Sequence, residues 1–229
     1  MILFDLDGTL LDDDAATAVG LDALHAQYAA RIACPRRDLA GVWLQLIESY
    51  FPRYLSGEMS MQEQRRARIR AIFGADASTC ADDEADAAHA VFLDGYERGW
   101  SCFPDVFPAL ARLSEAPLGL VTNGNDQQQR KKLERTGLAK FFSVVVTSDE
   151  FGAAKPNPKI FIEACRRGGV DASEAVFIGD NWDADVEGSL AAGLRPIWIR
   201  RGATRRQAPR GDVAVIETLD ALPSILAAR

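Results

Sequence analysis

The apolar residues of this chain fall into short runs that are separated by longer stretches of mixed character. Turn-forming residues bound these runs, which cover residues 2–6, 118–121, 144–146, 176–178, 197–199 and 213–216. Such short, uninterrupted apolar runs are typical of strands that are buried on both faces of a parallel sheet. The pattern therefore predicts a buried sheet whose strands are distributed along the whole chain.

Helical patterns alternate with these strands. Apolar residues recur on one helical face in two stretches, at Val106, Phe107, Leu110 and Leu113 and at Ile160, Phe161, Ala164 and Cys165. In the second stretch Asn157 suits the cap, Pro158 the first turn and Gly168 the end of a helix. Alternating strands and helices predict an α/β fold with a doubly wound, Rossmann-like parallel sheet.

Residues 14–98 break this rhythm because they offer only helical patterns. Apolar side chains recur there at Leu21, Leu24 and Tyr28 and at Trp43, Leu44, Ile47 and Phe51. We therefore predict a catalytic core made of residues 1–13 and 99–229, with a helical domain inserted at 14–98. An insertion after the first strand is expected over the carboxyl ends of the strands, where such folds bind ligands. The basic stretch 200–210 is predicted to be a solvated loop.

Composition narrows the classes of function. The 229 residues are 48% apolar and 26% charged, as in ordinary globular proteins, and the net charge of -7 argues against a nucleic-acid partner. No apolar run approaches a membrane span, and the acidic N-terminus does not resemble a signal peptide. We expect a cytoplasmic protein, either a monomer or a homodimer, with no membrane partner.

The first candidate chemistry lies in the segment FDLDGTL, where Asp5 and Asp7 end the first predicted strand. Side chains two apart on a strand point the same way, so the two carboxylates are expected to meet. Adjacent carboxylates need a cation, a shared proton or separate roles as nucleophile and acid. The simpler alternative is that both aspartates only solvate the end of a strand.

A second acidic group follows another strand in VFIGDNWDAD. If that strand neighbours the first, Asp180 can join Asp5 around a hard cation, and oxygen ligands of this kind suit Mg²⁺. Asp185 is a candidate for completing or orienting that ligand shell through water. For Asp183 we favour a helix-capping role, since acidic residues in a first turn complement the helix dipole.

Two further strand ends carry complementary groups. In LGLVTNG, Thr122 and the amide of Asn123 are positioned to donate hydrogen bonds to phosphate oxygens, although a Thr-Asn-Gly turn is often only structural. In AAKPNPKIF, Lys155 stands before two prolines that would aim its ammonium group at developing negative charge, and the alternative is a solvated surface lysine.

Missing motifs exclude other chemistries. Both histidines, His25 and His89, fall in the helical insertion, which disfavours a Ser-His or Cys-His mechanism. The chain has no phosphate-binding loop that ends in Lys-Ser or Lys-Thr and no dinucleotide fingerprint, so kinase and dehydrogenase chemistry lack their usual apparatus.

Taken together, these motifs resemble those of the haloacid dehalogenase-type (HAD) hydrolase superfamily. FDLDGTL, VTNG, the Lys155-Pro156 pair and GDNWDAD match its four motifs in order, and the insertion resembles its small helical cap of the first class. VTNGNDQQQRKKL and AAKPNPKIF are similar to the branch that contains nucleotide phosphatases and N-acylneuraminate-9-phosphatases.

The resemblance implies a phosphatase mechanism. Asp5 would attack phosphorus to give an aspartyl-phosphate, and Asp7 would protonate the leaving group and then activate water. Mg²⁺ would be held by Asp5, Asp180 and the backbone carbonyl of Asp7, and the partner would be a small phosphorylated metabolite such as a nucleotide or a sugar phosphate. Thr122, Asn123 and Lys155 would bind the phosphoryl oxygens, and the cap would exclude water.

Three alternatives remain within the same scaffold. A sugar-phosphate mutase would share both carboxylates and return the phosphoryl group to a second hydroxyl. A 2-haloacid dehalogenase is disfavoured. The family resemblance implies that dehalogenases lack the second aspartate of the first motif, whereas this chain has Asp7 at that position. A non-catalytic module that binds phosphorylated ligands is the third alternative.

Overall fold

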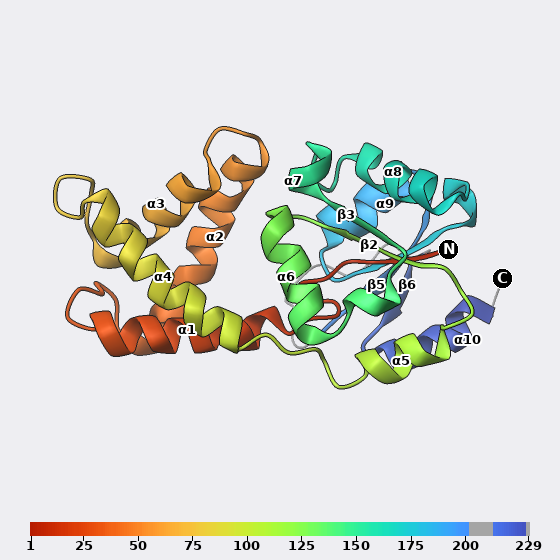
Figure 1. Cartoon of the computed structure of the whole chain (residues 1–229), viewed down its shortest axis with the longest axis horizontal. Coiled ribbons are helices and arrows are strands. Elements are labelled where there is room, and N and C mark those ends of the chain that lie inside the picture. Colours follow the sequence, from red (N-terminus) through yellow and green to blue (C-terminus); the bar gives the residue numbers. More distant parts are fainter. Residues whose placement is uncertain (202–212, 228–229) are drawn as a thin grey trace. The chain divides into compact units, whose positions relative to one another are not determined.

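The computed structural model describes residues 1–201 and 213–227, so most of the predicted basic loop at 200–210 lies outside the described residues. The chain divides into two compact units (Figure 1). Met1–Asp12 and the chain from Ser101 onward form the core unit, and Asp13–Trp100 form the helical unit. Within the described ranges, no helix is both long enough and apolar enough to cross a membrane.

One sheet organises the core unit. Its six strands in the described ranges pair in the order β3-β2-β1-β4-β5-β6, and all pairs are parallel. The strands are β1 (Ile2–Phe4), β2 (Leu118–Thr122), β3 (Val144–Thr147), β4 (Val176–Gly179), β5 (Arg195–Ile199) and β6 (Ala214–Ile216). This doubly wound sheet confirms the predicted α/β fold class. The direction of winding reverses at β1, so this central strand marks the crevice where such sheets bind ligands.

Helices cover both faces of the sheet. Successive side chains of a strand point to opposite faces, and the apolar side chains of both faces are buried under these helices. The core helices are α5 (Val106–Arg112), α6 (Asp126–Thr136), α7 (Ser148–Phe151), α8 (Pro158–Gly168), α9 (Gly188–Ala191) and α10 (Leu222–Ala227). Leu3 packs in the apolar cluster beneath α8, whereas the adjacent Phe4 packs edge-on against Phe142, with ring centroids 6.2 Å apart. Figure 1 shows α8 and α9 on one side of the sheet and α5 and α10 on the other.

The sequence signals of α8 correspond to real caps. The side chain of Asn157 accepts a hydrogen bond from the backbone N–H of Lys159, and Pro158 opens the helix. Gly168 is still helical, and the left-handed residue that ends the helix is Gly169. In α5 the predicted apolar face was partly wrong, because Phe107 is 40% exposed and its ring lies tilted against that of Phe141, with centroids 6.0 Å apart.

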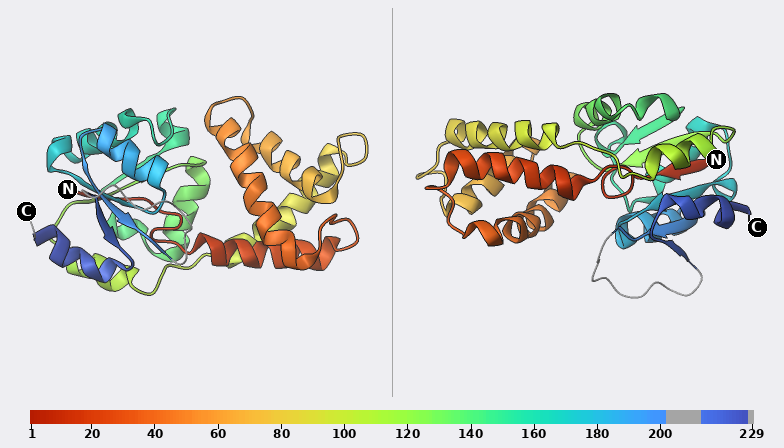
Figure 2. Two further views of the ribbon diagram at one scale, coloured as in Figure 1. Left: turned by 180° about the vertical axis from the view of Figure 1, so that it is seen from behind. Right: turned by 90° about the horizontal axis from the view of Figure 1, so that it is seen from below.

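The helical unit has its own apolar core. Its helices are α1 (Asp13–Tyr28), α2 (Leu39–Leu55), α3 (Met61–Phe73) and α4 (Asp82–Arg98), which Figure 2 shows from two further sides. Helices α1 and α4 pack closely, since a side chain on Gly95 would meet the Cα of Gly20 at 2.9 Å. Trp43 and Phe92 lie in the core with ring centroids 4.4 Å apart. Leu44, expected on the same buried face, is 55% exposed.

Candidate active site

The two acidic motifs meet because their strands are neighbours. Strand β1 pairs with β4 in parallel, with Phe4 opposite Ile178. Asp5 follows directly on Phe4, and Asp180 follows on the last residue of β4. The carboxyl ends of parallel strands share one edge of the sheet, and this edge therefore carries both aspartates.

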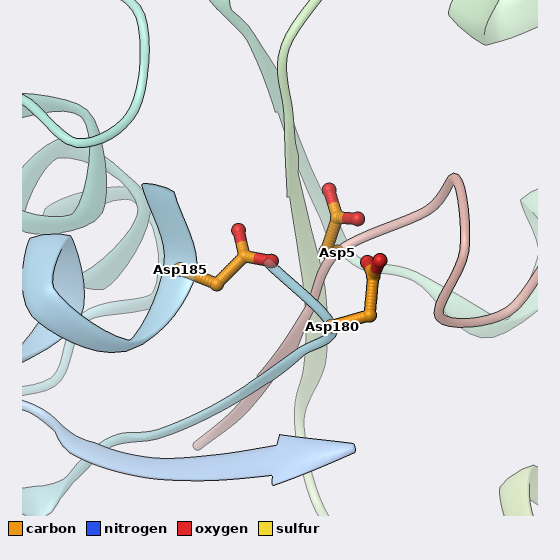
Figure 3. A group of neighbouring side chains, drawn as sticks. All are labelled: Asp5, Asp180 and Asp185. Atoms are coloured by element: carbon orange, nitrogen blue, oxygen red, sulfur yellow. The ribbon is translucent and has the colours of Figure 1, made fainter. Parts of the chain in front are cut away.

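Three carboxylates surround one space at this edge (Figure 3). Asp5, Asp180 and Asp185 each offer an oxygen, and these atoms all lie within 4.8 Å of one another. The Nζ of Lys155 donates to Oδ1 of Asp5 at 2.5 Å and to Oδ1 of Asp185 at 2.7 Å. Both of these carboxylates and the lysine are buried. The sequence placed Asp185 at the periphery of the site, whereas here it is one of the converging carboxylates.

A close-packed glycine and two hydrogen bonds hold Asp180 in place. Gly8 has a φ of +79°, and a Cβ there would meet the carboxylate of Asp180 at 2.6 Å. The hydroxyl of Thr9 donates to Oδ1 of Asp180 at 3.1 Å, and the indole N–H of Trp198 donates to its backbone carbonyl at 2.8 Å. The turn after β1 is therefore built around this one carboxylate.

A π-helical turn at Trp182–Glu187 carries Asp185 inward. Its Oδ2 accepts a hydrogen bond from the backbone N–H of Asn181 at 2.9 Å. Gly179 permits this approach, since a Cβ there would lie 2.4 Å from the carboxyl carbon of Asp185. The residue that caps the turn is Asn181, which accepts from the N–H of Ala184, while Asp183 lies exposed in the first turn, where its charge complements the helix dipole.

The cluster is electrostatically strained. Burial raises the pKa of Asp5 well above its ordinary value, with Lys155 opposing the shift and the carboxylates of Asp185 and Asp180 adding to it. Burial and then the charge of Asp185 raise the pKa of Asp180 to about 7, against the opposing effects of Lys155 and the Thr9 hydroxyl. Burial alone would lower the pKa of Lys155, but Asp185 and Asp5 together raise it above that of an ordinary lysine. One ammonium group therefore faces three carboxylates.

These residues fit a divalent cation. Converging carboxylate oxygens are the ligands that hard cations such as Mg²⁺ prefer, and an added positive charge would offset the burial and the repulsion that together raise the two aspartate pKa values. Lys155 takes one oxygen of Asp5 and one of Asp185, so its contacts do not by themselves decide which of the three carboxylates would hold the ion.

Asp7 has different surroundings from those predicted. Its carboxylate does not join the other three. The Nζ of Lys132 lies 2.7 Å from both of its oxygens, and Nε2 of Gln129 donates to Oδ2 at 3.0 Å. Strand β1 ends at Phe4, so the two-residue alternation that would place Asp5 and Asp7 together no longer applies beyond it.

The Thr-Asn pair at the end of β2 is engaged mostly in positioning. The Nδ2 of Asn123 donates to the carbonyl of Lys155 at 3.0 Å, and Oδ1 of Asn123 accepts from the backbone N–H of Lys155 at 2.8 Å. The hydroxyl oxygen of Thr122 accepts from Nε2 of Gln129 at 2.7 Å. Asn123 therefore clamps the backbone that presents the Lys155 ammonium, and one N–H of its side-chain amide is used in this contact.

Comparison with known proteins identifies the family. The family described as haloacid dehalogenase-like hydrolase matches residues 1–193. The chain belongs to this family. This confirms the resemblance drawn from the four motifs and makes the protein a hydrolase.

Relatives of this hydrolase include several phosphatases. Phosphoserine phosphatase of Thermus thermophilus is 32% identical over 88% of this chain and 89% of its own length, and N-acylneuraminate-9-phosphatase of Rattus norvegicus is 27% identical over 98% and 92%. Glyceraldehyde 3-phosphate phosphatase of Methanopyrus kandleri is 49% identical, but the match spans only 48% of each chain.

Solved structures show the same fold. The HAD-hydrolase YfnB of Bacillus subtilis, determined with bound magnesium, superposes with a TM-score of 0.80 at 26% identity, covering 98% of this chain and 97% of that one. A 2-haloacid dehalogenase of Pseudomonas syringae gives a TM-score of 0.69 at 33% identity, covering 99% and 97%.

Sequence reasoning missed Gln129 and Lys132 of the hydrolase. They lie in a polar run, NDQQQRKK, which offers little to show which face of α6 is buried. The signal was Leu133, the apolar residue at the end of this run. Gln129 lies four positions before Leu133 and three before Lys132, the spacings that place residues on neighbouring parts of one helical face, and both polar side chains are almost fully buried.

Arg201 was also missed, because it stands at the edge of the predicted basic loop. Its Nε and one terminal nitrogen donate to the carbonyl of Thr9 at 2.9 and 2.8 Å, and the other nitrogen donates to Oδ2 of Asp105 at 2.9 Å. Its guanidinium also lies 4.0 Å from the ring centroid of Phe103. Arg201 therefore braces the hydrolase loop that carries Asp5 and Asp7.

Proposed function

We propose that this hydrolase is a Mg²⁺-dependent phosphatase that cleaves a small phosphate monoester, such as a nucleotide or sugar phosphate, through an aspartyl-phosphate on Asp5. The observation that carries the proposal is the separation of the two aspartates of FDLDGTL. Asp5 lies in the acidic cluster with Lys155, and Asp7 lies apart with Lys132 and Gln129. The phosphatase relatives support the same reaction class.

In the first step, a carboxylate oxygen of Asp5 attacks phosphorus and the bond from phosphorus to the ester oxygen breaks. Asp7 in its protonated form gives its proton to that oxygen, so the product leaves as an alcohol. The ammonium of Lys155 offsets charge on the phosphoryl oxygens, and Asn123 holds the Lys155 backbone in position. Asp5 then carries the phosphoryl group.

In the second step, water attacks the same phosphorus and Asp7, now ionised, takes the proton. The bond between phosphorus and the Asp5 oxygen breaks, which releases inorganic phosphate and regenerates both carboxyl groups. Lys132 and Gln129 suit this step because they hold Asp7 by its ionised oxygens. The two lysines thus support the two different roles of the aspartates.

We assign the metal to Asp5 and Asp180, with the backbone carbonyl of Asp7 as a further ligand implied by the family resemblance. When bound, Mg²⁺ supplies positive charge that lets an anionic nucleophile approach an anionic phosphate. Asp185 and Thr9 then orient the lysine and the Asp180 carboxylate. The magnesium-bound relative YfnB supports this choice of ion.

We propose that the helical unit acts as a lid that limits the access of bulk water to the active site. Its chain leaves the core unit just after the loop that carries Asp7 and returns beside it, because the N–H of Asp12 donates to the carbonyl of Ser101 at 2.9 Å.

Two other activities on this scaffold fit less well. Halide displacement needs no acid for its leaving group, so it gives no role to an Asp7 held by two dedicated side chains. A sugar-phosphate mutase would use both aspartates but would return the phosphoryl group to substrate. Product analysis separates these cases, because a phosphatase releases inorganic phosphate, a mutase gives an isomeric ester and a dehalogenase gives halide.

The direct test is phosphate release from a panel of phosphorylated metabolites, with Mg²⁺ and with EDTA. We expect turnover of at least one small monoester that EDTA abolishes and that Asp5→Asn reduces by about 10⁴-fold or more, because nucleophile and ligand are lost together. Phosphate release that persists undiminished in Asp5→Asn would sink the proposal.

A further inference from the structure

The interior of the helical unit contains several buried polar atoms that have no hydrogen-bond partner among the described residues. The guanidinium of Arg68, on α3, lies over the indole of Trp43, with its Cζ 4.6 Å from the ring centroid. The Nε of Arg68, the indole nitrogen of Trp43 and Oε1 of Gln64 are buried and have no hydrogen-bond partner among the described residues. Gln64 and Arg68 are four positions apart and share one face of α3.

Positive charge also gathers around the cluster. Burial, and then the like charge of Arg65, lower the pKa of Arg68 to about 10, while Tyr96 and Asp13 act in the opposite direction. Burial followed by Arg65 and Arg68 lowers the pKa of His89 well below its ordinary value, so this imidazole is neutral near pH 7. The structure shows no ion pair to the Arg68 guanidinium within the described ranges.

Packing alone does not explain an arginine at this position. Stacking on Trp43 covers one face of the guanidinium but leaves its N–H groups in the ring plane, where they need acceptors. A leucine or methionine would pack on the indole without removing a charge from water. The side chain as a whole is partly exposed although its Nε is buried, so part of it is open to solvent.

The chemistry of the cluster specifies its ligand. A guanidinium whose face is covered presents parallel in-plane donors, the geometry that a carboxylate accepts in bidentate fashion. One carboxylate charge matches the single guanidinium charge. The buried Oε1 of Gln64 calls for a donor beside that carboxylate, and a hydroxyl or ammonium group meets this need.

We propose that Arg68, Trp43 and Gln64 form a binding site in the helical unit for the carboxylate of a small hydroxy acid or amino acid. The carboxylate has two possible sources. It belongs either to the phosphorylated substrate itself, an assignment that rests on the proposed phosphatase function, or to a separate carboxylate ligand. The site on the helical unit is the same in both cases.

Calorimetric titration of the full-length protein tests the site without any catalysis. We expect D-glycerate to bind and uncharged glycerol not to bind. Arg68→Met should weaken glycerate binding by at least about tenfold, because the charge partner is lost. Arg68→Lys should restore only part of it, since the planar fork is missing. The matched control is Arg37→Met, at an arginine of the same unit whose side chain is 85% exposed, and it should bind glycerate like wild type.

Kinetics then identify the source of the carboxylate. If the substrate carries it, the ratio of kcat/KM for 3-phosphoglycerate to that for glycerol 3-phosphate falls by about tenfold or more in Arg68→Met and stays constant in Arg37→Met. An unchanged ratio, with glycerate binding still dependent on Arg68, assigns the site to a separate ligand. Absence of turnover on every ester would contradict the phosphatase proposal while leaving the glycerate titration to decide the site.

Three results would overturn the site. They are failure of wild type to bind glycerate, binding that is equal in wild type and Arg68→Met, and binding that is lost equally in Arg37→Met. Folding of the variants is checked by thermal melting. A melting temperature of Arg68→Met at or above that of wild type supports the site, because an unpaired buried charge has been removed. A large drop would show that Arg68 is structural.

Discussion

The ammonium of Lys132 lies 2.7 Å from both carboxylate oxygens of Asp7, whereas Lys155 contacts Asp5 of the same short segment. Asp5 and Asp7 are separated by a single residue, yet each has its own buried lysine, one from α6 and one from the loop before α8. This division of partners fits the different tasks that the proposed mechanism gives to the two carboxylates.

Lys132→Met should lower kcat by about 10- to 100-fold with little change in KM, because Asp7 loses the group that positions it for proton transfer. The side chain of Asp7 is 29% exposed, so water can solvate it in the variant and stability should change little. Steady-state kinetics and thermal melting measure the two effects.

Lys159→Met provides the comparison, since Lys159 is an exposed lysine of the same unit. It should behave as wild type in both assays. A kcat for Lys132→Met within twofold of wild type would show that Asp7 needs no positioning by this lysine.

The raised pKa of Asp180 predicts a pH-dependent stability for the metal-free protein. The folded state keeps a proton on this cluster up to about pH 7, whereas an unfolded aspartate loses it near its ordinary value of 3.8. The resulting stabilisation is complete at pH values below the pKa of Asp180 in the unfolded state. It is lost as the pH rises through the pKa of Asp180 in the folded state. In EDTA, the melting temperature of wild type relative to Asp180→Asn should therefore fall between about pH 4 and pH 7.

Magnesium should reverse this trend, because the cation competes with the proton for the same oxygens. Addition of Mg²⁺ should raise the melting temperature of wild type more at about pH 8 than at about pH 5, and should have little effect on Asp180→Asn. An Asp180→Asn protein that keeps the wild-type response to Mg²⁺ at both pH values would remove Asp180 from the ligand set.

Asn123→Leu should reduce activity without unfolding the core. The leucine has a similar shape but loses both hydrogen bonds to the Lys155 backbone, which should cost about 1–3 kcal/mol of stability. Because the loop then no longer aims the ammonium, kcat/KM should fall by about tenfold or more. Kinetics on one fixed monoester together with a urea melt check this, and a stability loss with unchanged kcat/KM would reduce Asn123 to a purely structural residue.

Arg201→Met should destabilise the core unit by about 3 kcal/mol, because it leaves the Asp105 carboxylate buried without its cation and frees the Thr9 carbonyl. The neighbouring Arg200 pairs with Glu217 at the surface, so Arg200→Met should shift stability by less than about 0.5 kcal/mol. Denaturant unfolding of both variants measures the contrast, and equal effects would argue against the brace.

The sequence predicted the sheet well because buried parallel strands are continuous apolar runs. It located Asp5 and Asp180 at strand ends, and the pairing of β1 with β4 brings these two residues together. Lys155, also expected at a strand end, lies in the loop between α7 and α8 and reaches Asp5 from there. The surroundings of Asp7 could not be derived in the same way, because alternation fails where a strand ends. The partners Gln129 and Lys132 depend on how α6 rotates on the sheet, and only Leu133 marks that rotation locally.

Arg68 shows a different limit of sequence reasoning. In the run RRARIR each arginine fits a solvated helix face, and nothing local separates them. The structure pairs Arg66 and Arg70 with Asp82 and stacks Arg68 on Trp43. Only tertiary packing of α2 against α3 distinguishes a surface arginine from a buried one.

The most direct test of the central claim is to trap the covalent intermediate. The protein is mixed with a turned-over monoester and Mg²⁺, quenched in acid within one turnover, digested and mapped by mass spectrometry, with Asp5→Asn as the comparison. We predict one added phosphoryl group on the N-terminal peptide, located at Asp5 and absent from Asp5→Asn. Phosphate release by wild type with no phosphoryl group on Asp5 at any quench time would contradict the account.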